Sequence, residues 1–149
     1  PEQARAIIHQ KSEHGSYHHE IFYIQEFVEK PGRDIRAYVI GGEIVAASYR
    51  TSEHWITNAA RGAVSVPCPV TPEIEELALR ACAVVGARLA GVDLIETDEG
   101  LKVIEINTGG EFKGLMTTTD RDIAGEIVEE AARVARDRVL DPLTAASAG

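Results

Sequence analysis

Two neighbouring stretches of the chain are rich in apolar residues that favour β-strands, and this pattern predicts a strand in each. The stretches are residues 34–40 and 43–50, and Gly41 and Gly42 separate them. A glycine pair between strand-like runs is typical of a tight hairpin, because glycine adopts the positive φ angles that such turns need. Further short strands are expected at residues 22–28, 92–96 and 101–107, whereas residues 51–70 show no regular pattern.

Three other stretches carry apolar residues at helical spacing, and we expect helices there. The first covers residues 2–12. The second begins after Thr71, because threonine followed by Pro72 fits an N-cap and a first helical position; its apolar stripe is expected to run from Ile74 to Leu89. The third follows Asp122. Its inward-facing residues are expected to be Ile123, Ile127, Val128, Ala131 and Val134. The order of elements predicts an α+β fold, an antiparallel sheet with helices on one side.

Length and composition bound the class of protein. The 149 residues suit one domain, which we expect over residues 1–140, and the Ala- and Ser-rich residues 141–149 are expected to form a flexible tail. No apolar run is long enough to span a membrane. The net charge of −9 argues against nucleic-acid binding. Cys68 and Cys82 lack the spacing of a zinc site or a disulfide framework, and a cytoplasmic location is the simplest expectation.

A candidate metal site follows from the hairpin around residues 97–100. If Gly100 ends a three-residue loop, Glu96 faces Lys102, Asp93 faces Glu105, and Asn107 lies farther along the same face. Opposed carboxylates repel each other unless a cation lies between them. Carboxylate and amide oxygens suit Mg²⁺ better than zinc. The alternative is an ordinary polar, solvent-facing side of the hairpin.

Arginines supply a second candidate site. Arg36 and Arg50 lie inside apolar strand patterns, where a guanidinium needs an anionic partner. A phosphate group is a suitable partner, because the guanidinium fork binds two oxygens at once. Asn58 and Arg61 follow in a glycine-containing loop that could approach a substrate. The alternative, which applies most readily to Arg33, is a set of ordinary salt bridges.

Four stretches, read in order, together resemble one enzyme family. They are YIQEFVEKPGRDIRAYVIGGEIVAASYR, HWITNAARGA, GVDLIE and VIEINTGGEFKG. As a set they resemble the C-terminal half of the RimK-like ATP-grasp ligases, although each alone would be a weak signal. Within that family the likeness is strongest to the LysX ligases, which join α-aminoadipate to the C-terminal glutamate of the small acidic carrier protein LysW. The resemblance implies a C-terminal ATP-grasp subdomain, a fragment of a longer ligase.

The resemblance also implies roles for individual residues. The implied ATP-binding residues are Gln25, Glu26, Val28 and Asp34. The implied ligands of Mg²⁺, or of Mn²⁺ in its place, are Asp93, Glu105 and Asn107. The implied catalytic residues are Arg36 and Arg50, near the phosphates and the reacting carboxylate. The implied substrate-binding residues are Asn58, Arg61, Glu111 and Phe112.

The implied reaction is amide-bond formation through an acyl phosphate, in lysine or arginine biosynthesis. The amino acid joined to a LysW-like carrier is expected to be α-aminoadipate or glutamate. The family's N-terminal half is expected as a partner, and without it the chain is expected to be inactive; family members also commonly form homo-oligomers. Three alternatives stay open: a ligase that adds glutamate to a protein or peptide tail, a non-catalytic module that binds a nucleotide or a carrier, and a purely structural α+β domain.

Overall fold

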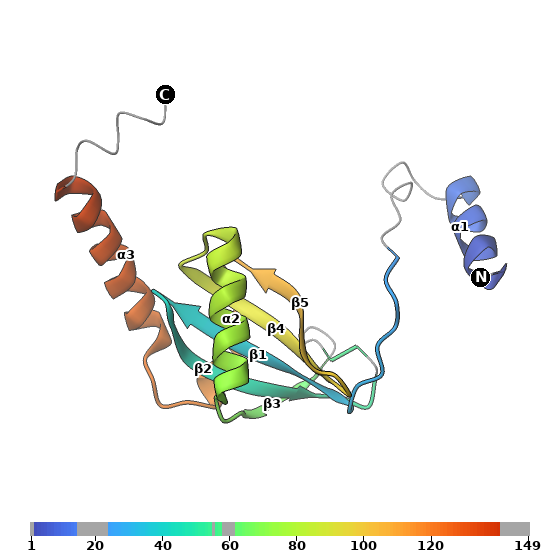
Figure 1. Cartoon of the computed structure of the whole chain (residues 1–149), viewed down its shortest axis with the longest axis horizontal. Coiled ribbons are helices and arrows are strands. Elements are labelled where there is room, and N and C mark those ends of the chain that lie inside the picture. Colours follow the sequence, from blue (N-terminus) through green and yellow to red (C-terminus); the bar gives the residue numbers. More distant parts are fainter. Residues whose placement is uncertain (1, 15–23, 55, 58–61, 141–149) are drawn as a thin grey trace.

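The computed structural model describes residues 2–14, 24–54, 56–57 and 62–140 (Figure 1). The elements are α1 (Glu2–His14), β1 (Arg33–Ile40), β2 (Glu43–Thr51), β3 (Val64–Pro67), α2 (Pro72–Val85), β4 (Leu89–Thr97), β5 (Gly100–Asn107), the short 3-10 helix η3 (Leu115–Thr117) and α3 (Ile123–Leu140). The tail expected at residues 141–149 lies outside the described residues, as do Asn58 and Arg61. The expected α+β class, an antiparallel sheet with flanking helices, is confirmed.

The five strands form one antiparallel sheet in the order β3-β2-β1-β4-β5. β1 and β2 form the predicted hairpin, and Gly41 (φ 63°) and Gly42 (φ 95°) supply the positive φ angles of its turn. β3 was not predicted. It is only four residues long and ends at Pro67, which cannot donate a backbone hydrogen bond, so a strand there is possible only at the edge of the sheet.

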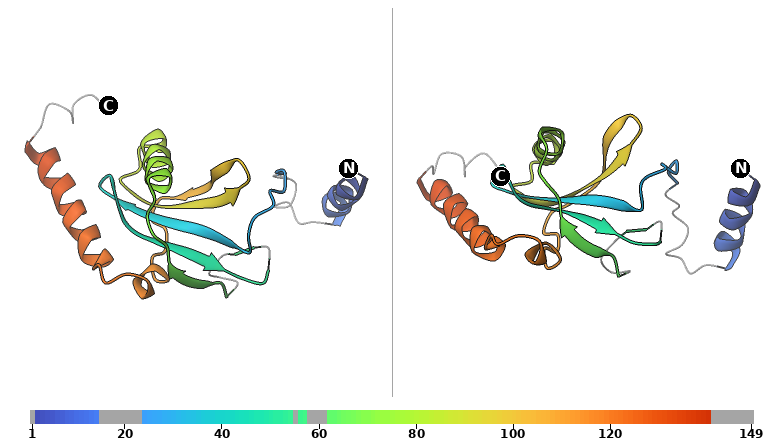
Figure 2. Two further views of the ribbon diagram at one scale, coloured as in Figure 1. Left: turned by 60° about the horizontal axis from the view of Figure 1, so that its bottom comes forward. Right: turned by 90° about the horizontal axis from the view of Figure 1, so that it is seen from below.

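Helices cover both faces of the sheet, and the expectation of helices on one side is therefore wrong. α2 packs on one face, against a buried cluster that includes Ile35 and Val39. Leu115 of η3 and Ile123 of α3 join Tyr38 in a second buried cluster on the opposite face. Figure 2 shows α2 and α3 on different sides of the sheet. The reason lies in β1, whose side chains are buried on both of its faces, so both need an apolar cover.

The ends of α2 are fixed by the residues that the sequence indicates. The Thr71 hydroxyl accepts a hydrogen bond from the backbone nitrogen of Ile74 at 3.3 Å, and Pro72 occupies the first turn. The helix ends before Gly86, whose φ of 67° is left-handed. It is shorter than predicted, because Leu89 already belongs to β4. Cys82 of this helix lies in the core, and both cysteines are buried and free, as expected from the lack of a disulfide pattern.

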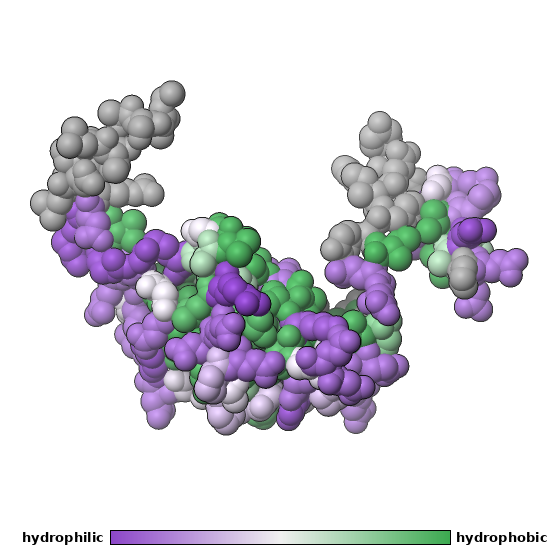
Figure 3. Space-filling view, in the orientation of Figure 1, coloured by the Kyte–Doolittle hydropathy of each residue, from purple (hydrophilic) through white to green (hydrophobic). Residues whose placement is uncertain are grey.

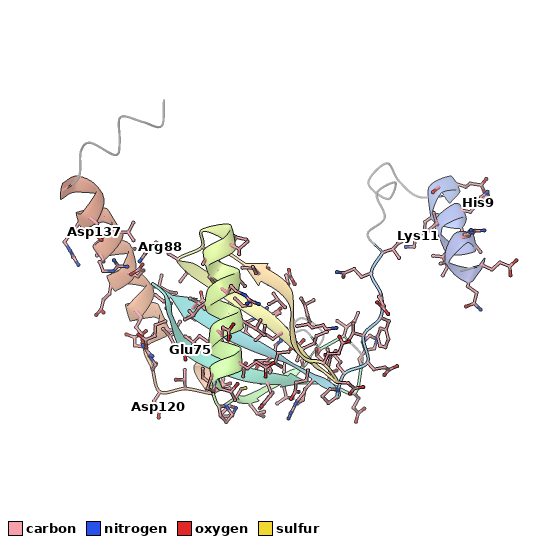
Figure 4. The ribbon with its side chains drawn as sticks, in the orientation of Figure 1. His9, Lys11, Glu75, Arg88, Asp120 and Asp137 are labelled. Atoms are coloured by element: carbon pink, nitrogen blue, oxygen red, sulfur yellow. The ribbon has the colours of Figure 1, made fainter. Side chains whose placement is uncertain are left out.

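The last helix begins as predicted, and two of its expected inward residues, Ile123 and Ile127, pack on the sheet. An Asp122 carboxylate oxygen accepts a hydrogen bond from the backbone nitrogen of Gly125 at 3.0 Å, as expected of an N-cap. Val128 and Ala131 are exposed, contrary to prediction. Arg88, which lies beside α3 in Figure 4, donates through Nε to Oε1 of Glu130 at 2.7 Å. This part of α3 therefore meets the sheet through charged side chains, which explains why its apolar stripe is short.

The segment before β1 is not a strand in its described part. Residues 24–30 have neither helical nor strand structure, whereas a strand was expected at residues 22–28. This segment cannot pair with β1, the strand that follows it, because β1 already pairs with β2 on one edge and with β4 on the other. α1 stands apart from the sheet in all of the ribbon views (Figures 1 and 2).

The hairpin between β4 and β5 has a different register from the predicted one near its turn. Thr97 pairs with Gly100, and Glu96 pairs with Leu101 rather than with Lys102. A bulge then adds one residue to β5, because Leu94 pairs with Val103 while Asp93 pairs with Glu105. The loop is one residue shorter than expected and the strand one residue longer. The predicted pairing of Asp93 with Glu105 is therefore confirmed.

Hydrophobic surface is visible around α2 and along the sheet beside it (Figure 3). The exposed large hydrophobic side chains of α2 and β5 are Val84, Val85, Val103 and Ile104. Within the described part of the chain, no helix is both long and apolar enough to cross a membrane.

The N-cap of α2 gives a prediction about stability. Replacing Thr71 by alanine leaves the backbone nitrogen of Ile74 without its side-chain acceptor, and we expect the free energy of unfolding to fall by about 1 kcal/mol. Thr71→Ser keeps the acceptor and should stay close to the parent protein. Urea unfolding monitored by circular dichroism measures both variants. Equal losses in the two would contradict the capping role.

Candidate active site on the sheet face away from α2

Polar side chains from four strands lie in register on the face of the sheet away from α2. One row across the sheet consists of Ser48 (β2), Arg36 (β1), Asp93 (β4) and Glu105 (β5). Alternate residues of a strand share a face, so Arg50, Asp34 and Asn107 lie on the same side, one step from this row. The sheet therefore gathers most of the described candidate residues on one surface, while its other face packs against α2.

A chain of ion pairs joins the buried members of this surface. Arg36 binds Asp93 through both Nε and Nη2, the latter at 2.9 Å from Oδ2. Arg50 donates through Nη2 to the same Asp93 oxygen at 3.0 Å and through Nε to Oδ1 of Asp34 at 2.6 Å. The Thr57 hydroxyl donates to the other oxygen of Asp34. The predicted need of Arg36 and Arg50 for anionic partners is thus met within the protein, by carboxylates.

Burial and charge act in opposite directions on Arg50. Its side chain is only 8% exposed, and loss of water alone would lower the pKa of its guanidinium. The hydrogen bond from Arg50 to Asp34 and the negative charge of Asp93 outweigh that loss and raise the pKa above its ordinary value. Arg50 therefore keeps its positive charge. The two arginines and two aspartates balance in charge, so each buried charge has an opposite partner within the chain.

Two glycines make room for Arg36 and Asn107. A Cβ on Gly91 would lie 3.0 Å from Nη1 of Arg36, and a Cβ on Gly110 would lie 3.1 Å from Cβ of Asn107. The Tyr38 hydroxyl fixes this turn by donating to the Gly110 carbonyl oxygen at 3.2 Å. Gly109 has a φ of 91°, which side chains disfavour. The Gly109-Gly110 pair is therefore required by the turn itself and by the closeness of Asn107.

Two cavities open on this surface, and Arg50 lines both. The first, which we call the linker cavity, has a volume of about 410 Å³ and is bordered by residues 25–28, Asp34, Asp93 and Glu105. The second, the loop cavity, has a volume of about 690 Å³. It is lined by Arg36, Ser48, Arg50, Ser65, Asn107, Gly110, Glu111, Lys113, Gly114, Leu115 and Thr117. Arg50 is thus shared by the two cavities.

The candidate residues divide between these cavities. Gln25, Glu26 and Val28 border the linker cavity together with Asp34, whereas Glu111 borders the loop cavity with Arg36. Phe112 lines neither; its ring lies against Tyr38, with 5.8 Å between the ring centroids, in the second buried cluster. The positions of Asn58 and Arg61 fall outside the described residues.

Lys30 and Thr57 are members of the linker cavity that the sequence did not indicate. Lys30 donates through Nζ to the Thr57 hydroxyl oxygen at 2.9 Å, which extends the polar chain from Asp34. Burial is the main influence on Lys30 and lowers its pKa. In the sequence, Lys30 is followed by Pro31 and Gly32, and this pattern predicts only a turn. The contact with Thr57 joins residues 27 positions apart, so no local pattern could indicate it.

The donor set proposed for Mg²⁺ consists of hard oxygen ligands on one face of β4 and β5. Asp93 is already bound by two guanidiniums, whereas Glu105 is exposed and has no ion-pair partner among the described residues. No group of three or more Asp, Glu, His or Cys side chains that could hold a metal occurs in the described part of the chain. Magnesium commonly binds through one or two protein carboxylates and completes its shell with phosphate and water oxygens. The residues fit that mode, with Glu105 as the available carboxylate.

Asp93 and Glu105 oppose each other but differ in environment, and this gives a prediction. Asp93→Asn leaves two arginines short of a negative charge in a buried site, so we expect a loss of about 3–5 kcal/mol in the free energy of unfolding. Glu105→Gln changes an exposed carboxylate to an amide and should cost no more than about 0.5 kcal/mol. Denaturant unfolding of both variants tests the difference. Similar losses would mean that the ion pairs of Asp93 do not support the fold.

Comparison with known proteins identifies the family. A model of the RimK-like ATP-grasp domain matches residues 2–131. The chain is 42% identical over 130 residues to the tetrahydromethanopterin:α-L-glutamate ligase of Methanococcus maripaludis, covering 85% of this chain and 43% of that protein. It is 40% identical over 115 residues to the α-aminoadipate–LysW ligase LysX of Saccharolobus solfataricus, covering 76% of this chain and 42% of that one.

Among solved structures, a RiPP-associated ATP-grasp ligase of Chryseobacterium gregarium, in complex with ADP and a leader and core peptide, matches with a TM-score of 0.55 and 25% identity. The match covers 69% of this chain and 33% of that one. The chain thus spans less than half the length of the curated relatives that it matches. Because the family model covers most of its residues, the chain belongs to the RimK-like ATP-grasp family.

Proposed function

We propose that this chain forms one wall of the active site of an ATP-dependent carboxylate–amine ligase. The observation that carries the proposal is that two cavities share Arg50 as a lining residue. A reaction that moves a phosphoryl group from a nucleotide to a second substrate requires both to bind side by side. We assign the nucleotide to the linker cavity and the substrate carboxylate to the loop cavity, on either side of one guanidinium.

The linker cavity suits a nucleotide in its chemistry. The apolar side chains of Val28, Ile95 and Ile104 border it and can enclose a purine ring. Asp93 and Glu105 also border it together with Arg50, where a triphosphate could bind. Magnesium, held by Glu105 and Asn107 with Asp93, would neutralise part of the phosphate charge. Phosphate oxygens would also offer Arg36 and Arg50 a second anionic partner beside the carboxylates that they already bind.

The proposed reaction has two steps. A substrate carboxylate attacks the γ-phosphorus of ATP, which gives an acyl phosphate and ADP. An amine then attacks the acyl carbon, phosphate leaves, and an amide bond forms with loss of a proton from the nitrogen. Negative charge develops first on the phosphoryl oxygens and then on the carbonyl oxygen. Arg50, buried and permanently charged, suits the stabilisation of both, because a preorganised cation in a dry site acts strongly.

The proposed amino-acid substrate is a dicarboxylate, α-aminoadipate or glutamate. The loop cavity carries the cations of Arg36, Arg50 and Lys113, with one carboxylate, Glu111, beside them. Such a set complements an amino acid that has two carboxylates and one ammonium group. Two relatives support the class by name, since one is an α-L-glutamate ligase and the other an α-aminoadipate ligase.

The proposed partner is a small carrier protein of the LysW type, whose C-terminal glutamate would be the carboxylate that is activated. A second candidate function is the addition of glutamate to another acceptor. It is favoured by the 42% identity to a tetrahydromethanopterin:α-L-glutamate ligase over 85% of this chain. ATP-dependent phosphate release by the full-length protein separates the two. Release that needs a LysW-type carrier supports the first, and release with tetrahydromethanopterin and glutamate supports the second.

The metal site gives a prediction that does not depend on the acceptor. Glu105→Gln in the full-length protein should weaken the binding of ATP in the presence of Mg²⁺ by about tenfold or more, because a charged metal ligand is lost. Without Mg²⁺ its affinity should equal that of the parent protein. Isothermal titration with and without EDTA measures both.

The matched control is Glu99→Gln, in the turn of the same hairpin, where the carboxylate binds Lys102 at 2.6 Å. This variant should keep the magnesium dependence of the parent protein. If Glu105→Gln also keeps it, Glu105 is not a metal ligand.

A further inference from the structure

The hydroxyl of Ser48 is buried and has no hydrogen-bond partner. Ser48 is 1% exposed, and its Oγ is the one buried side-chain oxygen or nitrogen without a partner in the described part of the chain. A buried hydroxyl that makes no hydrogen bond loses the bonds that water would give it, and this opposes folding. The neighbouring positions 46 and 47 are alanines, so an apolar residue of similar size is compatible with this strand.

The position of Ser48 relates this hydroxyl to the loop cavity. Ser48 lies on β2 directly opposite Arg36 of β1, and Arg50 follows two residues later on the same face. Ser48 lines the loop cavity together with both arginines, and it does not line the linker cavity. The unpartnered hydroxyl therefore belongs to the side of Arg50 that we assign to the substrate, not to the nucleotide side.

The surroundings define the group that the hydroxyl can bind. Arg36 and Arg50 are donors only, and both already bind carboxylates of the protein. Those carboxylates do not line the loop cavity, whereas both arginines do, so the cavity presents their donors and positive charge to an entering anion. A hydroxyl beside two guanidiniums completes the donor set for a carboxylate, since it can donate to one oxygen while the arginines hold the charge.

We infer that Ser48 is a substrate-binding residue whose hydroxyl donates a hydrogen bond to a carboxylate oxygen of the amino-dicarboxylate substrate in the loop cavity. The inference rests on the proposed function for the identity of that substrate. The hydroxyl of Ser48 would then contribute to substrate specificity. A substrate that lacks this carboxylate leaves the hydroxyl buried and unpaired, and its binding is therefore disfavoured.

Binding of L-glutamate and of L-α-aminoadipate, measured separately by calorimetry with the full-length protein, tests the inference. Ser48→Ala should weaken the binding of the preferred amino acid by about tenfold or more, which is the usual value of one hydrogen bond to a charged group. The affinity for ATP should not change. The matched control is Ser52→Ala, just beyond β2, whose hydroxyl accepts a hydrogen bond from the backbone of His54 and which lines neither cavity.

The melting temperature of the unliganded variant gives a second readout. Because the hydroxyl has no partner, Ser48→Ala should melt at the same temperature as the parent protein or above it. A fall of several degrees would show that the hydroxyl serves the fold, and it would overturn the inference. Unchanged amino-acid affinity in Ser48→Ala would overturn it too, as would a parent protein that binds neither amino acid.

The two proposals can fail separately. If the parent protein releases phosphate with its substrates and Ser48→Ala does so with the same KM for the amino acid, the proposed function stands and the role of Ser48 is refuted. If glutamate or α-aminoadipate binds in a Ser48-dependent manner but no acceptor elicits phosphate release, the role of Ser48 stands and the ligase function is refuted.

Discussion

The ion-pair chain Asp34–Arg50–Asp93–Arg36 is the interaction on which the rest of the site depends. It links three adjacent strands, β2, β1 and β4, through side chains that are almost fully buried. Burying single charges is costly, and the chain is tolerable because each charge meets an opposite one within hydrogen-bonding distance. The strands are thereby held in register by the same groups that give the surface its chemistry. Fold and site cannot be separated at these four positions.

This arrangement also determines how the site can respond to an anion. The two guanidiniums are already oriented, since each is bound in a fixed direction by a carboxylate. A phosphate or carboxylate entering either cavity meets cations that need no rearrangement. The two faces of the sheet differ in the same way. Apolar side chains under α2 form the core on one side, and the polar row is left for chemistry on the other.

Local signals were sufficient for part of the fold and of the site. Gly41-Gly42 and Thr71-Pro72 each constrain a few adjacent residues, so the first hairpin and the start of α2 could be predicted. The opposition of Asp93 and Glu105 was predicted as well, although by way of a loop that is one residue too long. The resemblance to RimK-like ligases indicated the family, which the match over residues 2–131 confirms.

What the sequence missed depends on contacts between distant residues. The cover on both faces of β1 arises because η3 and α3 return to the sheet, and no local pattern records that return. The contact of Lys30 with Thr57 and the unpartnered state of Ser48 are likewise tertiary properties. Phe112 was assigned to the substrate because of its place in a motif, whereas its ring packs against Tyr38. A motif indicates which residues belong together, but not which of them face the cavity.

The extra residue of β5, Ile104, separates the second hairpin into two parts. Toward the turn, pairing follows the short loop at Asp98 and Glu99; at the base, Asp93 remains opposite Glu105. The same carboxylate pair results whether the additional residue lies in the loop or in the strand. Hairpins of equal length can therefore exchange a longer turn for a bulge during evolution without moving the carboxylates. The length of the turn and the position of the carboxylates are therefore set by separate parts of the same hairpin.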